Sequence, residues 1–359
     1  KTEEVLARKL ANNDKKVRDK AVKVLGKWFE SKDSFSQLEM LKIWKGLFYC
    51  FWMSDKIPVQ QALSQDLAHL LLKFPTTKGS IRYTKAFFTT MFRDWNSIDY
   101  LRLDKFYSLQ RHFLQALFKL LQRQRWDNDA LFQFSNFFAK HVFTSFNGPL
   151  GVTYHYIDIY LEELIKLPAF AQSKHVKKGA IASSSSSPPT TLKPRKTLVI
   201  APEPFTLIIK PVLSLCAFTK LPKQVHPKVE KEFFKPLLKL LQKPADQQQI
   251  WLPETVIHYF LLIKALKRTL FQFASSSDII EKNRDWLYER ITQVQTLIEV
   301  YKTVLLAIVD GKKLTKDTKE FIDEHTKPSR QLFENDTSDS DDDDNYSSDI
   351  SDDTSDSDD

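Results

Sequence analysis

The segment SQLEMLKIWKGLFYCFW, residues 36–52, decides the fold class of this chain. It begins with Ser36 and Glu39 at the spacing of a capping box, which predicts the start of an α-helix. Apolar side chains follow at helical spacing and cover far more than one stripe of the circumference, so the helix is predicted to be buried on two sides. These apolar side chains are Leu38, Leu41, Trp44, Leu47, Phe48, Phe51 and Trp52.

The sequence leaves two interpretations of this helix open. In the first it is an interior helix between two layers of the fold, which is the commoner role of such a pattern. In the second its aromatic side chains form a ridge that binds a partner protein. The candidate interface residues under the second interpretation are Trp44, Phe48, Trp52, Asp55 and Lys56.

Helical spacing of apolar residues continues along most of the chain. No stretch shows the sustained alternation that is typical of strands, so the predicted fold class is all-α. Helices with short connections are expected to stack as antiparallel pairs in a HEAT-like array or α-solenoid, although no clean sequence period is present. Helices are expected at residues 14–29, 36–53, 58–74, 87–95, 97–125, 128–142, 156–165, 205–218, 227–242 with a kink at Pro236, 253–273, 278–309 and 315–333.

Composition narrows the class of protein further. With 42% hydrophobic and 13% aromatic residues among 359, the chain can bury a substantial core, and 7 glycines leave little for glycine-rich loops. The longest apolar run, residues 47–53, falls far short of the ~18 residues that a membrane-spanning helix needs, so a soluble protein is expected. The two cysteines, Cys50 and Cys216, allow at most one disulfide, which suits a reducing compartment better than secretion.

Charge divides the chain into a basic body and an acidic tail. Residues 334–359 hold 13 acidic side chains and no Lys or Arg, so the rest of the chain carries 53 basic and 32 acidic side chains, a net charge of +21. Such a tail can compete for basic surface or simply keep the protein in solution, and both roles stay open. The predicted organisation is a helical array at 1–172, a flexible Ser/Pro/Lys-rich linker at 173–197, a second helical region continuing the array at 198–333, and a disordered tail at 334–359.

Two lysine ridges on predicted helices are candidates for contact with RNA phosphates. Lysines on solvated helix faces are common, and neither ridge alone indicates a binding site. Together with a body charge of +21 they favour sequence-independent binding of a phosphate backbone. The ridge residues are Lys16, Lys20, Lys23 and Lys27 on the first, and Lys228, Lys231, Lys235 and Lys239 on the second.

Catalysis finds little support in the sequence. It contains no phosphate-cradling glycine loop, no H-E-x-x-H and no C-x-x-C, and no cofactor or small-molecule substrate is expected. The best metal-like set is His155, Asp158 and Glu162, which share one helix face. A metal-dependent RNase built on these three residues is the enzyme alternative, against a structural role in ion pairs and capping.

Four stretches of the first half resemble the nucleolar ribosomal RNA-processing protein 1 family of eukaryotes. The resemblance covers residues 6–167 in the family's order, and its motifs are specific because they are long and rich in Trp and Tyr. The stretches are Leu10-Ala-Asn with Val17-Arg-Asp-Lys-Ala21; Trp44-Lys-Gly-Leu-Phe-Tyr-Cys50 with Trp52 and Asp55-Lys56; Arg93-Asp-Trp95 with Ile98-Asp99 and Leu101-Arg-Leu-Asp-Lys-Phe-Tyr107; and Gly151 with His155, Ile157 and Leu161-Glu-Glu-Leu164.

The resemblance implies a non-catalytic assembly factor of the large ribosomal subunit. Such a factor is expected to be an α-helical array that works in the nucleolus within pre-ribosomal particles, contacting other assembly factors and precursor rRNA and being needed for rRNA processing. It supplies no active-site residues. A helical-repeat nuclear adaptor for transport or histone handling is the remaining alternative, because a helical array with an acidic tail also suits that role.

Overall fold

A computed structural model of the chain describes residues 2–32, 34–143, 149–167, 200–218, 220, 222–242 and 253–311. The chain divides into two units, Lys1–Lys313 and Leu314–Asp359, and every described residue lies in the first. All regular elements among these residues are helices, so the predicted all-α class is confirmed. The predicted linker at 173–197, the helix at 315–333 and the acidic tail at 334–359 lie outside the described residues.

The helices that start at Lys15 and Gln37 begin where the sequence predicts, because their caps are local sequence patterns. The Asp14 side chain accepts a hydrogen bond from the backbone N–H of Lys16. Ser36 and Glu39 form both bonds of the predicted capping box. The elements are α1 (Thr2–Leu10), α2 (Lys15–Ser31), α3 (Gln37–Trp52) and α4 (Ile57–His69), which continues as a 3₁₀ turn at Leu70–Lys73.

In the middle of the unit two helices start after an aspartate cap, whereas the helices expected at 87–95 and 156–165 begin earlier, at Thr77 and Leu150. Asp99 and Asp127 cap the next helices through their side chains, each accepting a backbone N–H three residues ahead. The elements are α5 (Thr77–Asp94), α6 (Tyr100–Arg123), α7 (Asn128–Phe137) with a π-helical turn at Phe138–Phe143, and α8 (Leu150–Leu164).

The last part of the unit contains a π-helical turn that the sequence pattern did not indicate. A helix with a kink at Pro236 is expected at 227–242, and the structure has an unbroken helical run at 225–242 that contains a π-helical turn ending two residues before the proline. Proline has no N–H to donate and its ring crowds the preceding turn, and the wider π turn accommodates both effects. The elements are α9 (Pro202–Phe218), α10 (Val225–Val229), the π turn Glu230–Phe234, α11 (Lys235–Gln242), α12 (Pro253–Ala274) and α13 (Glu281–Gly311).

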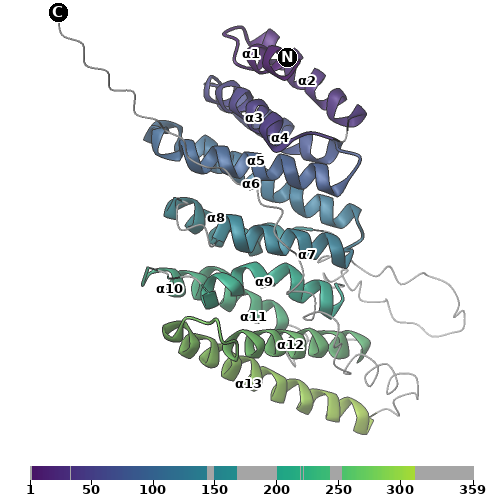
Figure 1. Ribbon diagram of the computed structural model, residues 1–359. Helices are drawn as coiled ribbons and strands as arrows, with labels where there is room; N and C mark the ends of the chain where they lie inside the picture. The colour runs from purple at the N-terminus through teal and green to yellow at the C-terminus, as the bar shows by residue number, and fades with distance from the viewer. Residues whose placement is uncertain are drawn as a thin grey trace, which may run out of the picture. The chain divides into compact units, whose positions relative to one another are not determined.

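Helices two apart in the chain pack on each other, which is the contact pattern of stacked helical pairs. α3 packs on α1 and α5, α6 packs on α4 and α8, and α9 packs on α7. Beyond the short α10 and α11, α9 also packs on α12. Figure 1 shows the labelled helices of the first unit following one another in chain order. The buried residues therefore form one continuous core along the stack of helices, as in a helical-repeat array.

Helix α1 was not predicted, and a glycine of α3 explains how it fits. A Cβ on Gly46 would lie 3.0 Å from both the Cα and the carbonyl oxygen of Ala7. The two helices thus approach backbone to backbone, which only a residue without a side chain permits. Gly46 belongs to the Trp44–Cys50 motif, so that motif includes the docking site for α1.

Buried tyrosines join successive helices by bonding to backbone carbonyls. The hydroxyl of Tyr83 on α5 donates to the carbonyl of Leu67 at 3.0 Å, and that of Tyr160 on α8 donates to the carbonyl of Ile208 on α9 at 2.6 Å. These bonds satisfy hydroxyl groups that burial removes from water. The Tyr160 bond also links helices on either side of residues 168–199. None of the helices in the described ranges has the length and apolar character needed to cross a bilayer.

Candidate functional site

The structure decides between the two interpretations of α3. Trp44 is completely buried and Phe48 is 4% exposed, so neither side chain can reach a partner. Trp44 packs against Tyr83, Phe87 and Phe113, and its indole N–H donates to the carbonyl of Tyr83 at 3.0 Å. Trp44 and Phe48 were therefore wrong as interface candidates, because helices on both sides of α3 cover them. The interior-helix interpretation applies to this pair.

The other interface candidates lie at the end of α3, where the chain turns into α4. Trp52 is half-buried, and Asp55 and Lys56 are exposed. The ammonium of Lys105 on α6 donates to the backbone carbonyls of Trp52 at 2.6 Å and Ser54 at 2.9 Å. The turn after α3 is thus fixed to the start of α6.

A second contact joins the same two turns. The guanidinium of Arg102 lies 5.0 Å from the centre of the Trp52 ring, a cation–π distance, and also pairs with Asp99 at 2.5 Å. Residues from the second and third motif stretches therefore meet here. We call the surface made by the α3–α4 and α5–α6 turns, with Trp52, Asp55, Lys56, Ile57, Tyr100, Leu101 and Arg102, the turn surface.

Apolar side chains are unusually exposed on the turn surface. Tyr100 is 80% exposed, Leu101 76% and Ile57 68%. Large apolar groups in water are costly, and several of them on adjacent turns, rimmed by charged residues, are typical of a protein-binding site. None of these three residues was among the predicted interface candidates, although Leu101 belongs to the third motif stretch, because an apolar side chain at a helix start gives the same sequence pattern whether it is covered or exposed.

Further along, the third and fourth motif stretches also meet. The Tyr107 ring lies 5.1 Å from the ring of Trp95 and 4.6 Å from that of His155, measured between centroids. A Cβ on Gly151 would lie 2.9 Å from the Tyr107 hydroxyl, so α8 passes this tyrosine closely. The motif residues here are packing residues at the junction of α6 and α8.

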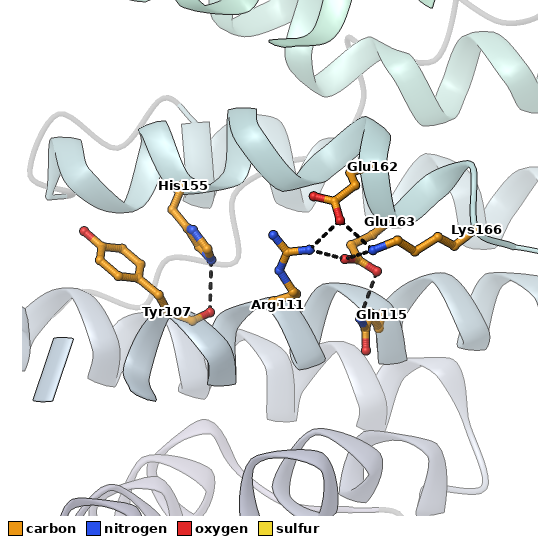
Figure 2. Close-up of polar contacts among 7 residues, drawn as sticks. All are labelled: Tyr107, Arg111, Gln115, His155, Glu162, Glu163 and Lys166. Carbon is orange, nitrogen blue, oxygen red and sulfur yellow. Dashed lines mark hydrogen bonds and ion pairs between the residues drawn. The ribbon is translucent and has the colours of Figure 1, made fainter. Parts of the chain in front are cut away.

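The predicted metal set is not brought together. In Figure 2, the imidazole of His155 bonds to the carbonyl of Tyr107 at 3.0 Å, whereas Glu162 lies in a separate ion-pair network. Asp158 pairs elsewhere, with Lys228 at 2.5 Å. Since the three side chains engage three different partners, the metal-dependent RNase alternative loses its geometric basis. Within the described ranges, no group of three His, Cys, Asp or Glu residues is placed to hold a metal ion.

The network around Glu162 joins α6 to α8. Arg111 donates to Glu162 at 2.8 Å and to the buried Glu163 at 2.6 Å, and Lys166 donates to the same two carboxylates (Figure 2). Gln115 donates to the second oxygen of Glu163 at 2.8 Å. The hydrogen bonds from Arg111 and Lys166 lower the pKa of Glu162. The buried carboxylate is fully satisfied, so the structural role that the sequence offered as the alternative describes this cluster.

The first lysine ridge is exposed on α2. Unlike their neighbour Lys15, which pairs with Asp19, the four ridge lysines have no ion pair with any described residue. Lys23 and Lys27 also line a groove of about 850 Å³ between α2 and α4. Unpaired ammonium groups on one helix face can all reach phosphates. The ridge residues are Lys16, Lys20, Lys23 and Lys27.

The second ridge is broken up. Lys228 is half-buried, pairs with Asp158 and lies 5.6 Å from the Tyr154 ring centre, so its charge is used within the fold. Lys231 pairs with Glu232 at 2.6 Å. Lys235 and Lys239 are exposed but lie beyond the π turn. The prediction of one continuous face is therefore wrong for Lys228, and we continue the RNA argument with the α2 ridge.

Comparison with known proteins connects this geometry to a family. The family model described as "Nucleolar protein, Nop52" matches residues 1–255, which is more than two thirds of the chain. The match includes α1 to α11 and thus both the turn surface and the α2 ridge.

Individual relatives align with the first half. "Ribosomal RNA processing protein 1 homolog A" of Mus musculus is 39% identical over 170 residues, 46% of this chain and 34% of the relative. The Homo sapiens protein of the same name is also 39% identical over 170 residues, 46% of this chain and 37% of the relative. The Drosophila melanogaster "Ribosomal RNA processing protein 1 homolog" is 35% identical over 166 residues, 45% of this chain and 24% of the relative. The alignments span little more than a third of these relatives' lengths at most.

Proposed function

Since this chain belongs to the Nop52 family of nucleolar proteins, we propose that it is a non-catalytic assembly factor of the large ribosomal subunit. It works in the nucleolus, inside pre-ribosomal particles, and is required for processing of precursor rRNA. The names of its relatives, which are ribosomal RNA processing proteins, support a role in rRNA processing. The role of scaffold rests on the fold.

The turn surface carries the proposal. It presents three strongly exposed apolar side chains on a base held by the Lys105 bonds, so partner binding needs little ordering of the surface itself. It is also where two motif stretches of the family meet. We assign it to a neighbouring assembly factor, with Tyr100 and Leu101 as the central contacts.

RNA contact is assigned to the α2 ridge. Its four unpaired ammonium groups suit a phosphate backbone, which offers charge at regular spacing and needs no base recognition. The protein then affects rRNA cleavage indirectly, by holding particle and RNA in a processable arrangement through many weak contacts. The division into two helical regions around a linker at 173–197, with an acidic tail, is retained as part of this proposal.

Affinity purification of the tagged full chain from nuclei tests the proposal. Recovery of precursor large-subunit particles is expected with the native chain, and strongly reduced recovery with Tyr100→Ser combined with Leu101→Ser. Leu38→Ser is the matched control, because Leu38 is 62% exposed at the start of α3 and does not belong to the turn surface. Equal recovery with the double variant would remove the turn surface from the proposal, and recovery of importins or histones in place of particles would overturn the function.

A further inference from the structure

A groove between α12 and α13 combines aromatic rings with unpaired cations. Its volume is about 600 Å³, and the two helices pack along each other (Figure 1). The contributing α12 positions recur at spacings of three and four, so they form one stripe along the helix. The lining residues are Phe260, Lys264, Lys267, Arg268 and Phe271 from α12, and Gln295, Ile298 and Lys302 from α13.

The charge of the groove is strongly positive. Lys264 and Arg268 are exposed and have no ion pair with any residue that the structure describes. Lys267 donates to the amide oxygen of Gln295 at 2.6 Å, and the same amide donates to Glu299, so Lys267 reaches a carboxylate only through this amide. Glu299 pairs with Lys302 at 2.9 Å and is the one carboxylate bonded to a lining cation within the described ranges. The groove therefore suits a polyanion.

The rings make the groove more specific than a basic patch. Phe271 is 52% exposed, although phenylalanine is among the residues that folding most often buries. Phe260 is half-buried, and the ammonium of Lys264 lies 5.5 Å from its ring centre. Cations that alternate with an accessible aromatic face are the arrangement on which single-stranded nucleic acids bind, since phosphates meet the charges and bases stack on the ring.

We propose that this groove binds a single-stranded RNA segment, with Phe271 stacking on a base and Lys264, Lys267 and Arg268 contacting phosphates. The site lies beyond residues 1–255, outside the family match, and it is separate from the α2 ridge. It therefore goes beyond the proposed function. An acidic protein segment would satisfy the cations equally well, but it has no need of a planar aromatic side chain.

Binding of labelled RNA to the full chain tests the proposal. The probe is a fluorescein-labelled strand of about 12 nucleotides, alone or annealed to its complement, followed by anisotropy. Phe271→Leu keeps the apolar volume but removes the stacking face, so Kd for the single strand should rise by roughly fivefold or more, while Kd for the duplex stays unchanged. Tyr288→Leu is the control, because Tyr288 is 42% exposed on α13 and does not line the groove.

Charge is tested separately. Lys264→Gln combined with Arg268→Gln should weaken binding of both the single strand and the duplex and reduce the salt dependence of Kd. A chain with Gln in place of all four lysines of the α2 ridge should still bind the single strand more weakly when Phe271→Leu is added. Unchanged single-strand affinity in Phe271→Leu overturns the proposal. So does tighter binding of polyglutamate than of RNA with no effect of Phe271→Leu, which would assign the groove to an acidic protein. Neither result affects the turn surface or the family's pathway.

Discussion

The ammonium group of Lys105 lies 2.6 Å from the backbone carbonyl oxygen of Trp52 and closes the end of α3 from a different helix. A helix leaves its last carbonyls without partners, and here a side chain 53 residues away supplies the donor. Lys105 is only 7% exposed, so its ammonium group and the carbonyl oxygen bond to each other in place of water. The turn surface depends on this arrangement.

Lys105→Met should destabilise the fold and loosen the α3–α4 turn. The substitution keeps most of the side-chain volume but leaves the carbonyls of Trp52 and Ser54 without their donor, at a cost of about 1–3 kcal/mol in the free energy of unfolding. Urea unfolding measures the loss. Lys45→Met, at an exposed position of α3, is the matched control and should change stability little; equal stability of the two variants would contradict the capping role.

The same lysine should give stability a pH dependence in the alkaline range. Burial lowers the pKa of Lys105 from 10.5 to about 8. Between these values the unfolded chain binds a proton that the folded chain does not, so this contribution to stability increases as pH rises from 8 to 10.5 and is constant below 8. The stability of the native chain relative to Lys105→Met should therefore increase over that window. A difference that is flat with pH would show that the ammonium is not desolvated.

Gly46→Ala should displace α1. The new Cβ would lie 3.0 Å from the Ala7 backbone, which cannot move aside as a flexible side chain can, and overpacking of this kind costs about 1–3 kcal/mol. Hydrogen exchange should show faster exchange across Thr2–Leu10 than in the native chain. Gly26→Ala is the control, because its Cβ meets only the Leu70 side chain at 3.4 Å and the gain in helix propensity should leave stability unchanged or higher. Similar exchange of α1 in both variants would contradict the close approach.

Mild acid should destabilise the protein through its partly buried histidines. Burial lowers the pKa of His69, His112, His155 and His226 below 6.5. For each, the unfolded chain takes up a proton before the folded chain does, so stability is complete above about pH 6.5 and falls as pH decreases through that value. Tm should decrease between about pH 7 and about pH 5.

His155→Gln should reduce this acid sensitivity. Glutamine can still donate to the Tyr107 carbonyl, which His155 bonds at 3.0 Å, but it does not titrate. The decrease in Tm over the same acid range should be smaller in the variant than in the native chain. Identical decreases would mean that His155 stays solvated enough to protonate freely.

Neutralising the α2 ridge should weaken RNA binding mainly at low salt. Each phosphate contact that the variant no longer makes should reduce the slope of log Kd against log salt by ~0.7 for single-stranded RNA, so four contacts account for a decrease of up to about 3. Titrations at several salt concentrations compare Lys16→Gln, Lys20→Gln, Lys23→Gln and Lys27→Gln, combined in one chain, with a control chain of equal charge. The control carries Gln at the exposed positions Lys78, Lys85, Lys140 and Lys282. Equal slopes in the two chains would exclude the ridge as a specific contact.

The sequence determined most of the helices and the resemblance to the family, because both depend on patterns within short stretches of chain. Caps at Asp14 and Ser36, apolar spacing of three and four, and motifs rich in Trp are local patterns that need no knowledge of the fold. They predicted an all-α array and the first lysine ridge. They also favoured the interior position of α3, since its apolar circumference is wider than one covering neighbour needs.

Only the tertiary structure decided which side chains remain available for partners. The apolar pattern shows which residues avoid water, but Trp44 and Tyr100 look alike until distant helices cover the first and leave the second 80% exposed. In the same way, the sequence alone allowed Asp158 to be a metal ligand, whereas the structure shows that it forms an ion pair with Lys228, 70 residues along the chain. Burial and ion pairing depend on contacts between residues far apart in the chain. The energy of such a contact depends on both residues and on the distance between them, which a local sequence pattern does not give.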